Sequence, residues 1–171
     1  MSDLDLETVA IHEAGHAVVA LALGRVVGWA IVAPTRGTTW IGIEGATRST
    51  IAIIAMAGSI AEGRAEIRTS DASKAKGTGL SEAKLVDLAF KTCAMIVRHK
   101  GAVAAVATAL RDRGRLSALA LKRIALVASP ALRELVAPIP RELVVLGASA
   151  IATDLFRFDE APSRAVARPR R

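Results

Sequence analysis

The chain has 171 residues, of which 52% are hydrophobic and 23% are charged, and its formal net charge is +7. The hydrophobic fraction excludes a wholly disordered chain, and the length suits one compact, largely helical domain with a single core. Four arginines among the last eight residues supply more than half of the net charge. We therefore expect a solvated basic tail and no nucleic-acid partner.

The first predicted element is a helix close to the N-terminus. Asp3 or Asp5 can cap its start, and Gly24 is favourable just past its end. Two short strands of β-branched residues and tryptophan follow, at residues 29–34 and 40–44, with a turn-like TRGTT segment between them. We therefore expect this helix to be followed by a small β-hairpin.

The remainder of the predicted domain is helical. Residues 69–79 are small and polar and contain glycine, which indicates a loop or a short capped turn. Ser81 is the candidate N-cap of a strongly amphipathic helix that follows this loop. A turn at residues 113–115 separates the last two helices. The predicted helices cover residues 50–67, 81–100, about 101–112 and about 117–128.

Cysteine content and hydropathy bear on location. The one cysteine, Cys93, excludes an internal disulfide and a zinc site built from cysteine pairs. The acidic N-terminus lacks the basic-then-apolar order of a signal peptide. The longest uncharged run, residues 49–61, is shorter than the roughly 20 residues that a membrane-spanning helix needs. These features favour a cytoplasmic location and no transmembrane span.

Residues 12–16 read His-Glu-Ala-Gly-His, within the first predicted helix. Side chains four residues apart lie one turn apart on one helix face, so His12 and His16 can bind one cation. This spacing is typical of a catalytic zinc site. Such a site also needs a third protein ligand and an open position for water. Glu13 lies beside the ligands as the general base, which takes a proton from that water and passes it to the leaving amine.

The alternative interpretation of this motif is a chance arrangement on a core or surface helix. The chain has only three histidines, and two of them frame a glutamate within an uninterrupted helical pattern. Chance produces this arrangement in about one of several hundred such chains. The metal site is therefore the favoured interpretation.

The motif and the segments after it resemble the zinc peptidase domain of the FtsH-type AAA+ membrane proteases. That family pairs HEAGH with a β-hairpin strand such as VGWAIVAP at residues 27–34, and then with a helix that contains A-G-x-x-A-E. The last pattern is matched by Ala57, Gly58, Ala61 and Glu62. The resemblance covers about residues 7–112. It implies a mainly α (α+β) peptidase domain in which the HExxH helix is followed by a small β-hairpin.

The resemblance also implies an aspartate as the third zinc ligand, in a segment of the pattern S-N-D-x-x-x-A. Asp71, with an alanine four residues later, fits this segment, and a carboxylate suits zinc beside two imidazoles. Three alternatives remain. Glu82 and Asp87 also read as solvated charges on a helix, and His99 also reads as a capping or surface residue near a helix end.

Two other features bear on the site. Glu62 reads either as the acceptor of a hydrogen bond from a ligating imidazole or as a surface glutamate. The strand at residues 39–43 reads either as purely structural or as an exposed edge that binds extended peptides by adding a strand. We expect Trp29 and Trp40 either to pack the hairpin on the helices or to line a substrate cleft beside the metal site.

These observations predict a stand-alone, Zn²⁺-dependent metallopeptidase over residues 1–128, acting on flexible or unfolded polypeptides. The sequence contains no GxxxxGK[ST] phosphate loop, so ATP-driven unfolding is not carried over from the family. Residues 129–171 are expected to form a partly ordered extension with a basic, disordered tail. One alternative is a zinc-stabilised, non-catalytic module that binds a protein partner. Another, an intramembrane zinc protease, is disfavoured without spanning helices.

Overall fold

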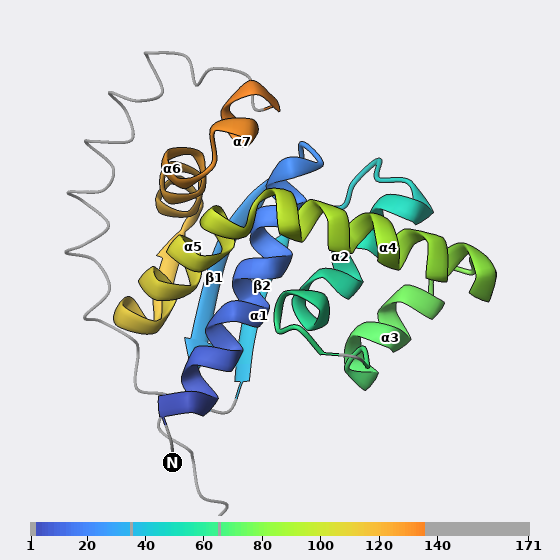
Figure 1. Ribbon diagram of the computed structural model, residues 1–171, viewed down its shortest axis with the longest axis horizontal. Coiled ribbons are helices and arrows are strands. Elements are labelled where there is room, and N and C mark those ends of the chain that lie inside the picture. Colours follow the sequence, from blue (N-terminus) through green and yellow to red (C-terminus); the bar gives the residue numbers. More distant parts are fainter. Residues whose placement is uncertain (1–2, 35, 65, 136–171) are drawn as a thin grey trace, which may run out of the picture. The chain divides into compact units, whose positions relative to one another are not determined.

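The helix that carries the HEAGH motif lies at the centre of the fold. The computed structural model describes residues 3–34, 36–64 and 66–135. In it α1 (Asp3–Ala22) packs against α2 (Arg48–Ala61), α5 (Lys100–Arg113) and a β-hairpin (Figure 1). The side chains of α1 that enter the core are mostly alanine and valine. Because these side chains are small, neighbouring elements approach the backbone of α1 closely from several sides.

The hairpin pairs β1 (Val27–Ala33) with β2 (Arg36–Ile41) in antiparallel register. A third strand, β3 (Arg115–Ser117), pairs with the other side of β1, so the strand order is β2-β1-β3. We predicted only a turn at residues 113–115 and missed this strand. It has three residues and is defined by its pairing with β1 rather than by a local pattern. β2 is therefore an edge strand.

The second strand of the hairpin starts and ends earlier than predicted. The expected strand covered residues 40–44 with Gly37 in the preceding turn, whereas Gly37 lies within β2 and pairs with Val32. A Cβ atom at Gly37 would collide with the side chain of Glu13 on α1. Glycine at this position therefore allows β2 to approach α1 closely, and it lies in the strand and not in the turn.

Two predicted boundaries after the hairpin are wrong. The helix expected over residues 50–67 ends at Ala61, and Gly63 follows with a φ of 70°, a conformation that ends helices. The segment expected to be a loop or a short turn contains the two-turn helix α3 (Thr69–Lys76). Its small polar residues have weak helix propensity, but α3 buries one face against α2. Tertiary packing therefore decides the structure of this segment.

The later helices follow the prediction closely. The Ser81 side chain caps α4 (Glu82–Arg98) by accepting a hydrogen bond from the Lys84 backbone N–H. The apolar face of this amphipathic helix packs against the core, with Leu88 and Thr92 buried. α6 (Ala118–Ala128) follows β3, and α7 (Pro130–Leu135) packs against α6 with Leu132 fully buried.

The mainly helical fold with a small antiparallel sheet confirms the predicted α+β class. α7 falls within the expected extension of residues 129–171, and the expected basic tail lies outside the described residues. Within the described part of the chain, no single helix has the length and apolarity to cross a membrane. α4 and α5 meet those criteria only as a pair, and they are bent by 76° at their junction.

Candidate metal centre

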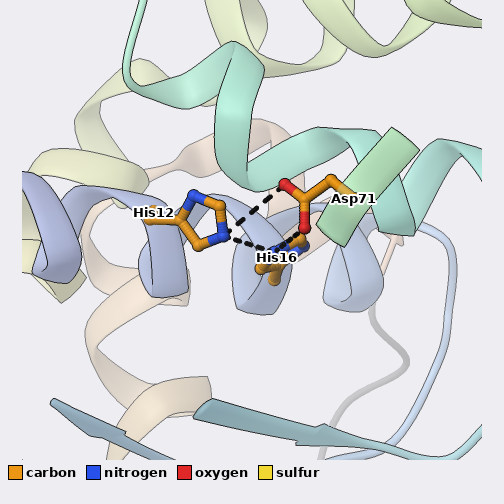
Figure 2. A group of neighbouring side chains, drawn as sticks. All are labelled: His12, His16 and Asp71. Carbon is orange, nitrogen blue, oxygen red and sulfur yellow. Dashed lines mark hydrogen bonds and ion pairs between the residues drawn. The ribbon is translucent and has the colours of Figure 1, made fainter. Parts of the chain in front are cut away.

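His12 and His16 lie one turn apart on α1, and Asp71 faces them from α3 (Figure 2). All three side chains are buried. Nε2 of His12 lies 3.1 Å from Nε2 of His16 and 3.5 Å from Oδ2 of Asp71. Nε2 of His16 lies 3.7 Å from Oδ1 of Asp71. The structure thus brings together the three residues that the sequence predicted as metal ligands.

The other nitrogen of each imidazole is held by an acceptor. Nδ1 of His12 lies 2.6 Å from a carboxylate oxygen of Glu62, and Nδ1 of His16 lies 2.7 Å from the carbonyl oxygen of Ile54. An ionised carboxylate and a carbonyl only accept, so each neutral ring carries its proton on Nδ1 and presents a lone pair at Nε2. Two lone pairs therefore face each other at 3.1 Å, and a cation between them relieves the repulsion.

The donor atoms lie close enough together to bind one metal ion. Ligands at about 2.0–2.2 Å from a zinc ion, at tetrahedral angles, lie about 3.3–3.6 Å from one another. The observed separations are of similar size: 3.1 Å between the two Nε2 atoms, 3.5 Å from His12 to Oδ2 of Asp71 and 3.7 Å from His16 to Oδ1 of Asp71. Oδ1 of Asp71 is buried and accepts no hydrogen bond from any residue that the structure describes. A bound cation supplies the partner that this oxygen lacks.

A glycine on α2 leaves room for the metal-binding face of α1. A Cβ atom at Gly58 would lie 2.5 Å from Nε2 of His16 and 2.7 Å from Nε2 of His12. Real Cβ atoms essentially never approach other atoms so closely. Only glycine at this position lets α2 pass the two imidazoles without displacing them.

A buried hydroxyl on α2 orients the carboxylate of Asp71. The Ser59 hydroxyl donates a hydrogen bond of 2.7 Å to Oδ2 of Asp71 and accepts one of 2.9 Å from the backbone N–H of Arg68. The second hydrogen bond ties the start of α3 to α2. Ser59 thereby holds one carboxylate oxygen and leaves Oδ1 facing the imidazoles. Ser59 was not among the predicted site residues, although a serine within the apolar run that follows Thr50 is a signal for such a role.

The predicted acceptor for a ligating imidazole is in place. The side chain of Glu62 is buried and holds His12 through the 2.6 Å contact. Arg64 and Arg68 form ion pairs of 2.5 and 2.7 Å with the same carboxylate. The two guanidinium groups thus help to hold the Glu62 carboxylate against His12. The surface alternative for Glu62 is therefore wrong, and the two arginines were not predicted.

The Glu13 side chain, next to His12 on α1, contacts Thr39 of β2. Its carboxylate accepts a hydrogen bond of 2.7 Å from the hydroxyl of Thr39. Burial raises the pKa of the Glu13 carboxyl, and the Thr39 hydrogen bond and the nearby His12 offset part of that rise. A raised pKa brings a carboxylate closer to the range in which it works as a general base.

A cleft of about 540 Å³ opens beside the ligand cluster, and both Glu13 and His16 line it. β2 forms one wall of the cleft. The opposite lining includes Lys74 of α3 and Thr78, which lies just after the end of α3. Four isoleucines give the cleft an apolar side; they are Ile41, Ile43, Ile51 and Ile54. A polar, ionisable centre next to an apolar wall is the usual composition of a small-molecule or peptide site.

The alternative third ligands are not part of the cluster. Glu82 and Asp87 lie on the exposed side of α4, and Asp87 pairs with Lys84 and Lys91. His99 sits between α4 and α5, where its imidazole is buried and hydrogen bonded to Ser129 at 3.0 Å. His99 is thus a buried residue at a helix end, and the surface interpretation is wrong.

The His16 imidazole is in the protonation state that metal binding requires. Burial, together with the neighbouring His12, lowers the pKa of the His16 imidazole to about 4, although Asp71 opposes the shift. His16 is therefore neutral at pH 7, with its Nε2 lone pair free to bind a cation.

Comparison of the chain with protein-family models finds no match, and comparison with curated proteins finds none either.

Proposed function

We propose that this protein is a zinc-dependent metallopeptidase with an FtsH-type peptidase domain, acting without ATP on flexible or unfolded polypeptides. The observation that carries the proposal is the convergence of two Nε2 lone pairs and a buried carboxylate beside Glu13. Two neutral imidazoles and one carboxylate are the donor set of many catalytic zinc sites. The proposal keeps a cytoplasmic location, in which the exposed thiol of Cys93 stays reduced.

The residues take the following roles in the proposed reaction. His12, His16 and Asp71 hold the ion, which supplies Lewis-acid chemistry and lowers the pKa of water when it is bound. Glu13 accepts a proton from the attacking water and transfers it to the leaving amine. The Thr39 hydroxyl holds one oxygen of the Glu13 carboxylate and so limits its rotation.

The edge strand supports a polypeptide as the substrate. β2 pairs with β1 on one side only, and Thr38 and Thr39 of β2 line the cleft beside Glu13. An extended peptide that adds to this edge runs past the Glu13 carboxylate with its backbone held by main-chain hydrogen bonds. Such binding favours a flexible or unfolded segment, because most of the extended backbone in a folded chain is already paired within its own sheets.

Two measurements on purified protein test the proposal. A Glu13→Gln variant should retain bound zinc and lose cleavage of an unstructured protein such as casein. The Asp71→Ala variant should lose zinc, whereas the Glu82→Ala and Asp87→Ala variants should keep it, since both carboxylates lie outside the cluster. Unchanged cleavage by Glu13→Gln would contradict the mechanism. Stoichiometric zinc without cleavage of any peptide library would favour the non-catalytic, partner-binding module.

A further inference from the structure

α4 has two apolar faces, and only one of them enters the core. The buried face carries Leu88 and Thr92. The opposite face carries an exposed apolar strip, which we name the outer stripe. At about 100° per residue, its members occupy about 100° of the helix surface. The residues of the outer stripe are Ala83, Val86, Phe90, Cys93, Ala94 and Val97.

The large side chains of the outer stripe are well exposed to solvent. Val86, Phe90 and Val97 are 53%, 74% and 64% exposed. Contiguous apolar surface of this kind marks an interaction site on a soluble domain. The spacing Val86, Phe90, Cys93, Val97 alternates steps of four and three residues, which is the seam that one helix offers to another.

We propose that the outer stripe binds the same stripe of a second copy of this chain, with the two α4 helices antiparallel. The 4-3-4 spacing is symmetric about a point between residues 91 and 92. An antiparallel second copy therefore places Val86 opposite Val97 and Phe90 opposite Cys93, so that these four side chains meet apolar partners. Such a self-complementary patch is what a two-fold symmetric interface needs.

The charges along α4 favour the same arrangement. Glu82, Lys84 and Asp87 give the N-terminal half of the helix a net charge of −1, and Lys91 and Arg98 give the C-terminal half a charge of +2. Antiparallel helices set the acidic half of one copy against the basic half of the other, with Asp87 near Arg98 of the second copy, and their dipoles oppose each other favourably.

Sedimentation of the full-length protein over a range of concentrations tests the proposal. The wild type should dimerise, and Phe90→Glu should weaken dimerisation about 30-fold or more. Val127→Glu is the matched control: Val127 is 73% exposed on α6, away from the outer stripe, and its substitution should leave dimerisation unchanged. A short bis-maleimide should link wild-type copies through Cys93 at concentrations where Phe90→Glu gives no linked product.

A charge exchange tests the antiparallel orientation. Asp87→Arg and Arg98→Asp should each weaken the dimer, and the double variant should restore it, because the pair reforms with reversed polarity. A monomer at every concentration overturns the proposal, as does equal weakening by Phe90→Glu and Val127→Glu. Shielding of Cys93 from maleimide in a monomer, or binding of vesicles through Phe90, also overturns it and identifies a different occupant. None of these readouts depends on zinc or on peptidase activity.

Discussion

The Ser59 hydroxyl lies 2.7 Å from Oδ2 of Asp71 and donates a hydrogen bond to it in the buried contact between α2 and α3. This hydrogen bond fixes the orientation of the carboxylate and leaves the buried Oδ1 without a hydrogen-bond donor among the described residues. It also explains how a short, polar helix holds a ligand in place, since the same hydroxyl accepts the backbone N–H of Arg68 just before α3 begins.

We predict that Ser59→Ala weakens zinc binding about 10–100-fold, the usual effect of removing a group that orients a ligand. Zinc affinity, measured by competition with a chromogenic chelator, checks this. Ser129→Ala is the control, because it also removes a buried hydroxyl, one that bonds His99 away from the ligand cluster. Equal affinities for Ser59→Ala and Ser129→Ala would show that Ser59 does not position Asp71.

Alanine at two glycines should separate metal binding from catalysis. Gly58→Ala places a methyl group against both ligating imidazoles and should reduce zinc binding to the level of Asp71→Ala. Gly37→Ala places its methyl group against Glu13 alone and should retain zinc while losing peptide cleavage. Metal content and casein cleavage of both variants check this. Zinc retention by Gly58→Ala would mean that the imidazoles have room to move.

Thr39 should act on turnover through Glu13. Thr39→Val keeps the shape of the side chain but loses the hydrogen bond to the Glu13 carboxylate, and it should lower kcat about 10-fold or more with zinc affinity unchanged. Thr39→Ser keeps the hydroxyl and should restore most of the activity. If Thr39→Ser is as impaired as Thr39→Val, the methyl group and not the hydrogen bond matters.

The metal-free protein should lose stability as the pH falls from 7 to 5. Burial lowers the pKa of His16 to about 4, and burial also lowers the pKa of His99. The unfolded chain therefore takes up protons below about pH 6.5, before the folded chain does. The two neutral histidines stabilise the fold fully above that pH, and this contribution falls as the pH approaches their folded-state pKa values.

Urea unfolding in the presence of a chelator measures this effect. The midpoint should be lower at pH 5 than at pH 7, and the decline should be shallower in a His99→Gln variant, which titrates one group fewer. Identical midpoints at the two pH values in the wild type would contradict the expected protonation states.

Helix periodicity and end signals made most of the fold predictable. The apolar pattern around residues 12–16, the cap at Ser81 and the glycine at residue 24 are local features, and each lies where the sequence indicated. The HEAGH spacing also placed His12 and His16 on one face of α1, because side chains four residues apart share a helix face.

The remaining features depend on contacts between distant segments. β3 has no local pattern, since it is defined by its pairing with β1. α3 has weak helix propensity, and burial of Asp71 and Ala75 against α2 stabilises it. Ser59, Arg64 and Arg68 entered the site only once folding had brought these segments together.

By itself, therefore, the sequence determined that two imidazoles and a glutamate share the surface of one helix, because helical spacing is local and needs no partner. The tertiary structure alone decided that Asp71, and neither Glu82 nor Asp87, completes the cluster. The physical reason is packing: Gly58 lets α2 pass close to the imidazoles, and α2 then carries Ser59 and α3 to the positions from which the carboxylate can reach them.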